Sequence, residues 1–155
     1  MNLQRAIEIA VEAHKGQVDK AGSLYVLHPL RVMMSLDTED EKIVGVLHDV
    51  VEDCEGWTWD RLRSEGFSEK IIDALQSVSK TPEEEAEFRL LPEQLKLESY
   101  LLYIGRVVNN DIGKKVKIAD IIDNLDETRI GEIGERDEYR LDRYRRSLKI
   151  LLESQ

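Results

Sequence analysis

The chain has 155 residues, a length that folds most simply as one domain spanning residues 1–155. Its 32 acidic and 22 basic residues leave a net charge of −10, which argues against a nucleic-acid binder with a basic surface. No apolar stretch is long enough to span a membrane, and the N-terminus lacks the basic and apolar blocks of a signal peptide. A phosphorylated small molecule is still compatible with this charge, because a local basic pocket or a metal ion can outweigh it.

Cysteine usage bears on the compartment in which the protein works. Cys54 is the one cysteine, so no internal disulfide can form, and this favours a cytoplasmic protein. We predict that Cys54 is an inert side chain and not a nucleophile. The sequence leaves the oligomeric state open.

The composition favours an all-α fold, since only three prolines and nine glycines interrupt a chain rich in good helix formers. We expect a compact bundle of several helices. Apolar periodicity and capping residues predict helices over about 2–14, 28–36, 39–53, 58–66, 68–78, 95–108, 115–125 and 135–152. Thr38 and Glu41 have capping-box spacing at the start of the third helix, and residues 109–113 read as a turn. Residues 80–94 are interpreted as a solvated connection in preference to a mobile segment over a site.

The end of the segment 39–53 carries one imidazole and three carboxylates within six positions. On a continuous helix His48 would face Glu52, and Asp49 would face both Glu52 and Asp53, at i+3 and i+4 spacings. Such charge is costly on a largely apolar helix unless it is paired, hydrogen-bonded or bound to a metal. An exposed acidic helix end is the alternative interpretation.

A second unusual carboxylate lies in the predicted helix 115–125. Apolar residues surround Asp120, so we expect it to be buried, and Asn124 follows one turn later on the same face. A buried aspartate needs a partner, which can be a metal ion, a basic residue or a cap.

These side chains suggest a metal site between helices. The candidate ligands are His28, His48, Asp49 and Asp120, which come from three predicted helices. A mixed set of nitrogen and oxygen ligands suits Mn²⁺, Fe²⁺ or Zn²⁺ better than Ca²⁺. In the alternative without a metal, His28 caps a helix and Asp120 pairs with a lysine.

Four motifs occur in order between residues 13 and 124. They are Ala-His-Lys-Gly-Gln at 13–17, Tyr-Val-Leu-His-Pro at 25–29, Leu-His-Asp-Val-Val-Glu-Asp at 47–53, and Lys-Ile-Ala-Asp at 117–120 with Asn124 four residues on. This series resembles the HD superfamily of metal-dependent phosphohydrolases. It is most similar to the hydrolase domain of RelA/SpoT-type enzymes and to the small stand-alone alarmone hydrolases.

The resemblance implies a helical HD-domain bundle that holds one Mn²⁺ through His28, His48, Asp49 and Asp120. It also implies roles for residues near the metal: Glu52 and Asp53 would handle the attacking water, and Lys20, Asn124 and Tyr144 would contact the substrate. The implied reaction is hydrolysis of guanosine 3′,5′-bis(diphosphate), ppGpp, at its 3′ position to give GDP and pyrophosphate. His14 matches a family position that is not a metal ligand, and we expect loop backbone to satisfy it.

Some positions depart from the family pattern. Asp19 stands where the alarmone hydrolases usually have an arginine beside the guanine, and a carboxylate cannot reproduce the stacking of a guanidinium. Asp123 stands where relatives often have an aromatic or small polar residue. The alternatives to an alarmone hydrolase are an HD-type nucleotidase or pyrophosphatase acting on another nucleoside phosphate, or a non-catalytic nucleotide-binding regulator.

Overall fold

Over residues 1–129 and 131–154, which the computed structural model describes, the chain forms helices and no strand, and this confirms the predicted all-α class. The α-helices are α1 (Leu3–Ala13), α2 (Leu27–Met34), α3 (Glu39–Leu47), α4 (Val50–Asp53), α5 (Trp59–Ser64), α6 (Glu69–Val78), α7 (Pro82–Leu90), α8 (Lys96–Val107), α9 (Asp111–Asn124) and α10 (Glu135–Glu153). Two short 3-10 helices, η1 (Glu93–Leu95) and η2 (Glu127–Arg129), precede α8 and α10. None of the described helices has the length and apolar character needed to cross a membrane.

Several helices begin where the sequence predicts, because polar side chains cap their first turns. The hydroxyl groups of Thr38, Thr58 and Ser68 each accept a hydrogen bond from the amide three residues later, at the starts of α3, α5 and α6. The Glu41 carboxylate accepts from the amide of Thr38 and completes the predicted capping box. Each cap of this kind stabilises its helix by about 0.5–2 kcal/mol.

The predicted single helix over residues 39–53 is interrupted, because α3 ends at Leu47 and α4 begins at Val50, although His48 and Asp49 between them keep right-handed helical dihedral angles. Nδ1 of His48 donates a hydrogen bond to the carbonyl oxygen of Gly45 at 2.7 Å. A side-chain donor that takes a helical carbonyl competes with the backbone amide that would continue the helix. His48 and Asp49 therefore lie in a turn between α3 and α4, and Glu52 does not continue the helical face of His48.

The solvated connection expected over residues 80–94 is also wrong, since most of this segment forms α7 and η1. Thr81 and Glu84 form a capping box, with Pro82 in the first turn. The capping signal is present in the sequence, but the acidic residues around it favoured the interpretation as a solvent-exposed connection. None of the residues of α7 is buried, and two hydrogen bonds from Arg106 to Glu84, at 2.7 and 3.0 Å, tie α7 to α8.

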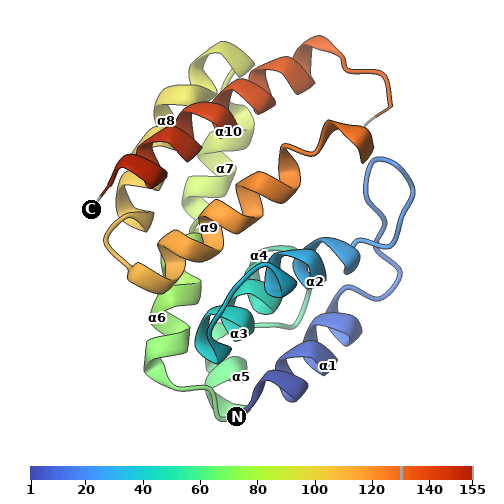
Figure 1. Ribbon diagram of the computed structural model, residues 1–155, viewed down its shortest axis with the longest axis vertical. Helices are drawn as coiled ribbons and strands as arrows, with labels where there is room; N and C mark the ends of the chain where they lie inside the picture. Colours follow the sequence, from blue (N-terminus) through green and yellow to red (C-terminus); the bar gives the residue numbers. More distant parts are fainter. Residues whose placement is uncertain (130, 155) are drawn as a thin grey trace.

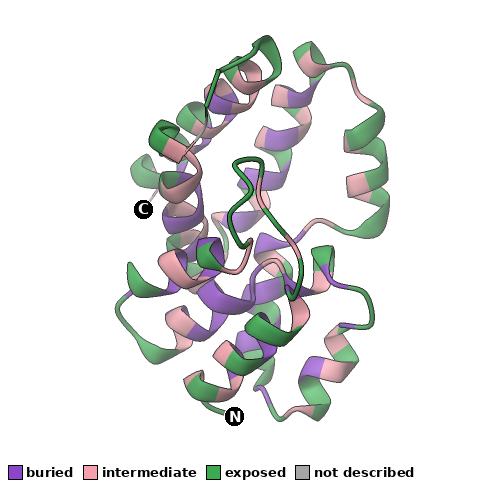
Figure 2. Ribbon diagram, turned by 90° about the vertical axis from the view of Figure 1, so that its right-hand side faces the viewer, coloured by how far each residue is buried: buried purple, intermediate pink, exposed green. Residues whose placement is uncertain are grey.

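α9 lies between two hydrophobic clusters and contributes to both (Figure 1). One cluster gathers residues of α1, α2, α3, α5 and α6 around Val116 and Ala119. The other gathers residues of α8 and α10 around Ile121. Figure 2 shows the buried residues along the inward turns of the helices and the exposed ones on outer turns and loops. Asp120 lies on α9 at the seam between the two clusters.

Gly45 allows α2 and α3 to approach each other closely. A Cβ atom at this position would lie 2.6 Å from Cδ1 of Leu36 and 3.4 Å from Cα of Met33, so a larger residue would push the segments apart. This close approach brings His28 on α2 next to His48 at the end of α3, with ring centroids 5.3 Å apart.

Candidate metal centre and the cavity beside it

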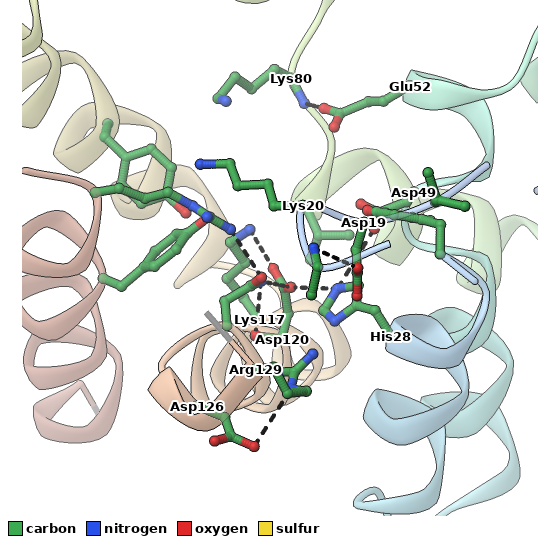
Figure 3. Close-up of a pocket in the computed structure, with 18 of the residues that line it drawn as sticks. Asp19, Lys20, His28, Asp49, Glu52, Lys80, Lys117, Asp120, Asp126 and Arg129 are labelled. Carbon is green, nitrogen blue, oxygen red and sulfur yellow. Dashed lines mark hydrogen bonds and ion pairs between the residues drawn. The ribbon is translucent and has the colours of Figure 1, made fainter. Parts of the chain in front are cut away.

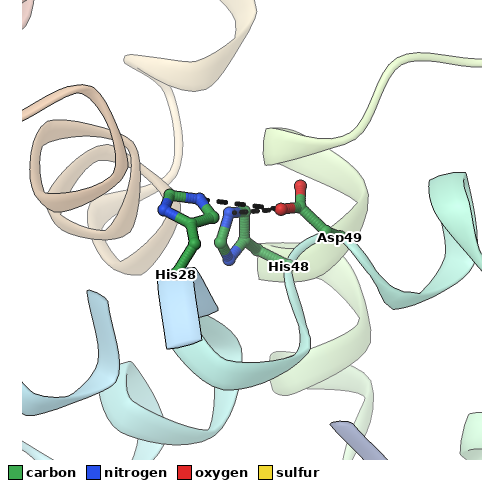
Figure 4. Close-up of side chains that lie close together, drawn as sticks. All are labelled: His28, His48 and Asp49. Atoms are coloured by element: carbon green, nitrogen blue, oxygen red, sulfur yellow. Dashed lines mark ion pairs between the residues drawn. The ribbon is translucent and has the colours of Figure 1, made fainter. Parts of the chain in front are cut away.

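Two imidazole rings from different helices direct their Nε2 atoms toward the same point. His28 and His48 are both buried, and Figure 4 shows them beside Asp49. Nδ1 of His48 donates to the Gly45 carbonyl oxygen, and Nδ1 of His28 lies 2.6 Å from Oδ2 of Asp123. A carbonyl or carboxylate oxygen can only accept, so in the neutral rings these contacts place the proton on Nδ1 and leave a lone pair on Nε2.

Asp49 and Asp120 each present one carboxylate oxygen to these lone pairs. Oδ2 of Asp49 lies 3.1 Å from Nε2 of His48 and 3.7 Å from Nε2 of His28. Oδ1 of Asp120 lies 3.1 Å from Nε2 of His28 and 3.5 Å from Nε2 of His48. The ligand atoms of His28, His48 and Asp49 lie within 4.8 Å of one another, and Asp120 joins this group through its approach to both histidines. The four predicted ligands thus come together from α2, the α3–α4 turn and α9, and metal binding itself stays a prediction.

The chemistry of this set calls for positive charge between the four atoms. A nitrogen lone pair and a carboxylate oxygen repel each other at 3.1 Å unless a proton or a metal ion lies between them. Nε2 of His48 is buried and has no well-oriented hydrogen-bond partner among the described residues. Burial opposes the charged form of His48, but Asp49 and Asp120 outweigh it and raise its pKa well above the usual value. Two nitrogen and two oxygen ligands fit a divalent ion such as Mn²⁺, Fe²⁺ or Zn²⁺.

Neighbouring side chains hold both carboxylates in place. The Tyr25 hydroxyl donates to Oδ2 of Asp49 at 2.6 Å. Nδ2 of Asn124 donates to Oδ1 of Asp120 at 2.7 Å, and Nζ of Lys117 donates to Oδ2 of Asp120 at 2.7 Å. The lysine pair that was an alternative to metal binding is thus present, but it occupies one carboxylate oxygen while the other faces the histidines.

The two predicted catalytic carboxylates follow directly on α4. Glu52 accepts a hydrogen bond from the amide of Lys80, so it points toward the junction of α6 and α7 and not along a helical face shared with His48. The side chains of Glu52 and Asp53 both reach solvent. The surrounding protein still removes part of the hydration of Glu52, and this desolvation and the charge of Asp49 raise its pKa to about 7, against the opposing effect of the Lys80 amide. Partial desolvation and Asp49 likewise raise the pKa of Asp53 to about 6. Both groups can therefore exchange protons near neutral pH.

A cavity of about 540 Å³ lies beside this centre (Figure 3). His28, Asp49, Asp120 and Glu52 form part of its wall, whereas Asp53 is not among the lining residues. The cavity also takes in all three residues predicted to contact substrate, which are Lys20, Asn124 and Tyr144. Their position agrees with the predicted role, and substrate contact itself stays a prediction.

The cavity wall carries as many cationic as anionic side chains, whereas the protein as a whole has a net charge of −10. The cationic ones are Lys20, Lys80, Lys117, Arg129 and Arg140, and the anionic ones are Asp19, Asp49, Glu52, Asp120 and Asp126. Tyrosines line it as well, and the rings of Tyr100 and Tyr144 lie 6.1 Å apart in an edge-on arrangement. A phosphorylated ligand with an aromatic ring fits a wall of this composition.

Several of these residues were not identified from the sequence. Lys80 is the first residue of the segment 80–94 that was interpreted as a connection, and Arg129 lies in η2, which no periodic pattern predicts. Arg140 is on the predicted final helix, but only the fold reveals that it reaches Oδ1 of Asn124 at 3.3 Å. A basic residue on an otherwise charged helix carries no signal in the sequence that separates it from a solvated one.

The departure at Asp19 has a local structural role. Oδ1 of Asp19 accepts hydrogen bonds from the amides of Ala21 and Ser23, both at 2.9 Å, and so shapes the loop before α2. Lys20 is exposed at the tip of this loop and pairs with Asp137 across the cavity at 3.1 Å. The loop therefore presents a lysine to the cavity while the aspartate holds its turn.

His14 and Cys54 lie outside the candidate centre. The His14 ring is buried and pairs with the side-chain oxygen of Gln17 at 2.8 Å, so the expectation that loop backbone satisfies it is wrong. Cys54 is buried, and burial followed by the charge of Asp53 raises its pKa to about 11. The group is a neutral thiol at physiological pH, in agreement with an inert role.

Sequence comparison finds similarity to curated proteins over most of the chain. A guanosine-3′,5′-bis(diphosphate) 3′-pyrophosphohydrolase of Spiroplasma citri is 32% identical over 127 residues, which are 79% of this chain and 16% of that protein. A GTP pyrophosphokinase of Myxococcus xanthus is 28% identical over 127 residues, with the same two coverages of 79% and 16%. The chain thus spans about a sixth of the length of these relatives. No protein-family model matches the chain.

The fold is similar to that of a solved structure from a metazoan SpoT ortholog, which is described as a protein that "hydrolyzes ppGpp and plays a role in starvation responses". The two share a TM-score of 0.76 over 98% of this chain and 86% of the other, at 21% sequence identity. These comparisons confirm the predicted resemblance to RelA/SpoT-type enzymes in sequence and in fold.

Proposed function

We propose that this chain is a metal-dependent phosphohydrolase that acts on ppGpp and releases pyrophosphate from its 3′ position. The observation that carries the proposal is the convergence of His28, His48, Asp49 and Asp120 beside a cavity lined by several lysines and arginines. The similarity of the chain to named ppGpp 3′-pyrophosphohydrolases supports the substrate class. The lone cysteine supports a cytoplasmic location as part of the same proposal.

The metal would be Mn²⁺, held by one nitrogen each of His28 and His48 and by one oxygen each of Asp49 and Asp120. When bound, such an ion lowers the pKa of a water molecule and polarises a phosphoryl oxygen. Of these ligands, His28, Asp49 and Asp120 also line the cavity, which gives a substrate phosphate direct access to the centre.

Glu52 is the proposed general base. Its carboxylate lines the same cavity and is fixed by the amide of Lys80, and its pKa of about 7 lets it accept the proton of an attacking water. The water oxygen would form a bond to the phosphorus next to O3′, and the bond from that phosphorus to O3′ would break. Water loses one proton to Glu52 and O3′ gains one, so GDP and pyrophosphate leave. Asp53, with its raised pKa of about 6, is proposed as a second carboxylate that orients or relays the proton.

The cationic side chains of the cavity wall are proposed to bind the phosphate groups of the substrate. Lys80 comes from the α6–α7 junction and Arg140 from α10. Lys117 is paired with Asp120 and Lys80 with Glu85, whereas Arg140 contacts the neutral side chains of Asn124 and Tyr144 and is the cation best placed to bind a phosphate. The rings of Tyr100 and Tyr144 and the amide of Asn124 would contact the nucleoside, and Lys20 would approach from the loop before α2.

A second candidate is an HD-type phosphohydrolase for a different nucleoside phosphate. It is favoured by Asp19, whose carboxylate holds the loop turn and offers no guanidinium to stack on a guanine. This candidate keeps the metal centre and Glu52 and differs only in the ligand of the cavity. A non-catalytic nucleotide-binding regulator is the third reading, and Glu52 argues against it because an extra carboxylate would repel a bound phosphate.

The test is release of pyrophosphate from ppGpp in the presence of Mn²⁺, with Glu52→Gln as the catalytic control. Pyrophosphate and GDP in equal amounts from the wild type, and not from the control, are the expected result. A protein that binds Mn²⁺ and cleaves only other nucleoside phosphates would support the second candidate. A protein that binds ppGpp without turning over any of these nucleotides would overturn the assignment as an enzyme.

A further inference from the structure

Asp123 forms a contact with the candidate metal centre that the proposed reaction does not use. Its carboxylate is largely buried, with 13% of the side chain exposed, and Oδ2 lies 2.6 Å from Nδ1 of His28. Oδ1 accepts a hydrogen bond from Nε of Arg31 at 2.8 Å, and Oδ2 accepts one from Nη2 of Arg31 at 3.1 Å. Nη2 of Arg129 lies 3.2 Å from Oδ2 and also donates to the backbone oxygen of Asp123.

We propose that Asp123 is a positioning residue that keeps His28 in the tautomer able to bind the metal. The inference rests on the proposed metal-dependent function. An imidazole that donates from Nδ1 presents a lone pair at Nε2, whereas the other tautomer would direct a proton from Nε2 into the centre. An ionised Asp123 carboxylate cannot donate a hydrogen bond and can only accept one. It therefore selects the tautomer of His28 that is protonated at Nδ1, and it fixes the plane of the ring.

Two arginines also contact the Asp123 carboxylate, and either one can balance its charge. Arg31 binds the carboxylate in a two-pronged contact from α2, the helix that also carries His28. The carboxylate is therefore tied to the same helix as the ring that it orients. Arg129 is held in part by the Asp123 backbone, so a change of the Asp123 side chain leaves that anchor in place.

The two histidines of the centre differ in how their tautomers are set. The backbone carbonyl of Gly45 orients His48, and no substitution of a side chain removes that acceptor. A side chain orients His28. Of the two histidines, His28 is therefore the one whose orientation a substitution can change without replacing a metal ligand. Loss of such an outer partner typically weakens metal affinity by about 10–100-fold.

The test compares Asp123→Asn and Asp123→Ala with the wild type by two measurements that need no substrate. The first is the Kd for Mn²⁺ from calorimetric titration. The second is the tautomer of His28 in the metal-free protein, read from long-range ¹H–¹⁵N spectra at a pH where the ring is neutral; the chain has only three histidines. We expect the Kd to rise by about 10–100-fold in both variants and the proton of His28 to shift toward Nε2, most clearly where the asparagine amide can donate to Nδ1.

Two controls separate positioning from charge and from packing. Asp126→Asn removes an equal charge near Arg129 without touching His28, and it should bind Mn²⁺ as the wild type does. Arg31→Met breaks the α2–α9 ion pair but leaves Asp123 against His28, and it should retain both the tautomer and the affinity. If Arg31→Met weakens Mn²⁺ binding as much as Asp123→Asn with the His28 tautomer unchanged, Asp123 has only a structural role and the proposal falls.

Further outcomes distinguish this inference from the proposed function. An unchanged tautomer and an unchanged Kd in both Asp123 variants would overturn it, as would a wild-type protein that binds no Mn²⁺. Tighter Mn²⁺ binding by the wild type than by the Asp123 variants, together with the tautomer shift, would support it even if the protein failed to hydrolyse ppGpp. In that case the proposed substrate would be wrong while the role of Asp123 would stand.

Discussion

Nε2 of His28 lies 3.1 Å from Oδ1 of Asp120, an approach that joins α2 to α9 at the seam between two hydrophobic clusters. When the neutral imidazole carries its proton on Nδ1 and the carboxylate is ionised, neither atom can donate a hydrogen bond to the other. A proton or a metal ion must therefore reconcile the two groups, and the same holds for His48 and Asp49 at 3.1 Å. Packing of the helices thus holds together groups that repel one another unless a cation lies between them.

Loss of a ligand should abolish metal binding and lower stability. We expect His48→Ala and Asp120→Ala to retain no stoichiometric Mn²⁺ after buffer exchange, as measured by elemental analysis. Mn²⁺ at 100 times its Kd should stabilise the wild type by about 2.7 kcal/mol and should leave the melting temperatures of these variants unchanged. Asp120→Ala also removes the partner of the buried Lys117, a change that typically costs about 3–5 kcal/mol. A variant that keeps stoichiometric metal would remove its residue from the ligand set.

Glu52→Gln should bind metal normally and lose catalysis. The amide still accepts the hydrogen bond from the Lys80 amide, so the fold and the metal centre should persist, but it cannot take a proton from water. We expect kcat to fall by about 10²–10⁴-fold, the usual contribution of a general base. Glu55→Gln, an exposed neighbour, is the matched control and should turn over as the wild type does. Turnover near the wild-type rate in Glu52→Gln would rule Glu52 out as the base.

The pH dependence should report Glu52. As a base it must be ionised, so kcat/KM should rise with pH up to about 7 and then level off, with a lower midpoint when a bound cation favours the carboxylate. The pKa in the folded state lies above the ordinary value of 4.5, so the native state binds the extra proton between these values. The contribution of this protonation to the free energy of unfolding is fully present below pH 4.5 and is lost as pH rises through about 7. We therefore expect the free energy of unfolding of metal-free Glu52→Gln, measured relative to that of the metal-free wild type, to be higher at pH 8 than at pH 4. If kcat/KM of Glu52→Gln still rises with pH over the same range, the rise is caused by another group.

Arg140 should contribute to substrate binding more than to the chemical step. It lines the cavity and is partly buried between Asn124 and Tyr144. Loss of a hydrogen bond to a charged group costs about 1.5–3 kcal/mol, so Arg140→Gln should raise KM by about 10–100-fold at nearly constant kcat. Arg145→Gln, an exposed arginine of the same helix paired with Glu127, is the control and should leave KM unchanged. If Arg140→Gln instead lowered kcat by a similar factor and left KM unchanged, Arg140 would act in the transition state.

The sequence by itself determined the fold class, most helix boundaries and the candidate ligands. Helix starts depend on local signals such as Thr38 with Glu41, whose hydrogen bonds form within one turn of chain. The ligand candidates stood out because charged side chains among apolar neighbours, such as Asp120, are costly to bury without a partner. Both kinds of signal are contained in a few consecutive residues.

Only the tertiary structure decided how these residues meet. The break at His48 depends on a side-chain hydrogen bond to Gly45 that periodicity does not register, and it turns Glu52 toward Lys80. Asp123 was visible in the sequence only as a departure from a motif, because its contacts with α2 cross the bundle. The cationic side chains of the cavity wall likewise come from elements far apart in the chain. Which charges face one another is set by helix packing, and the burial that shifts their pKa values exists only once the helices have come together.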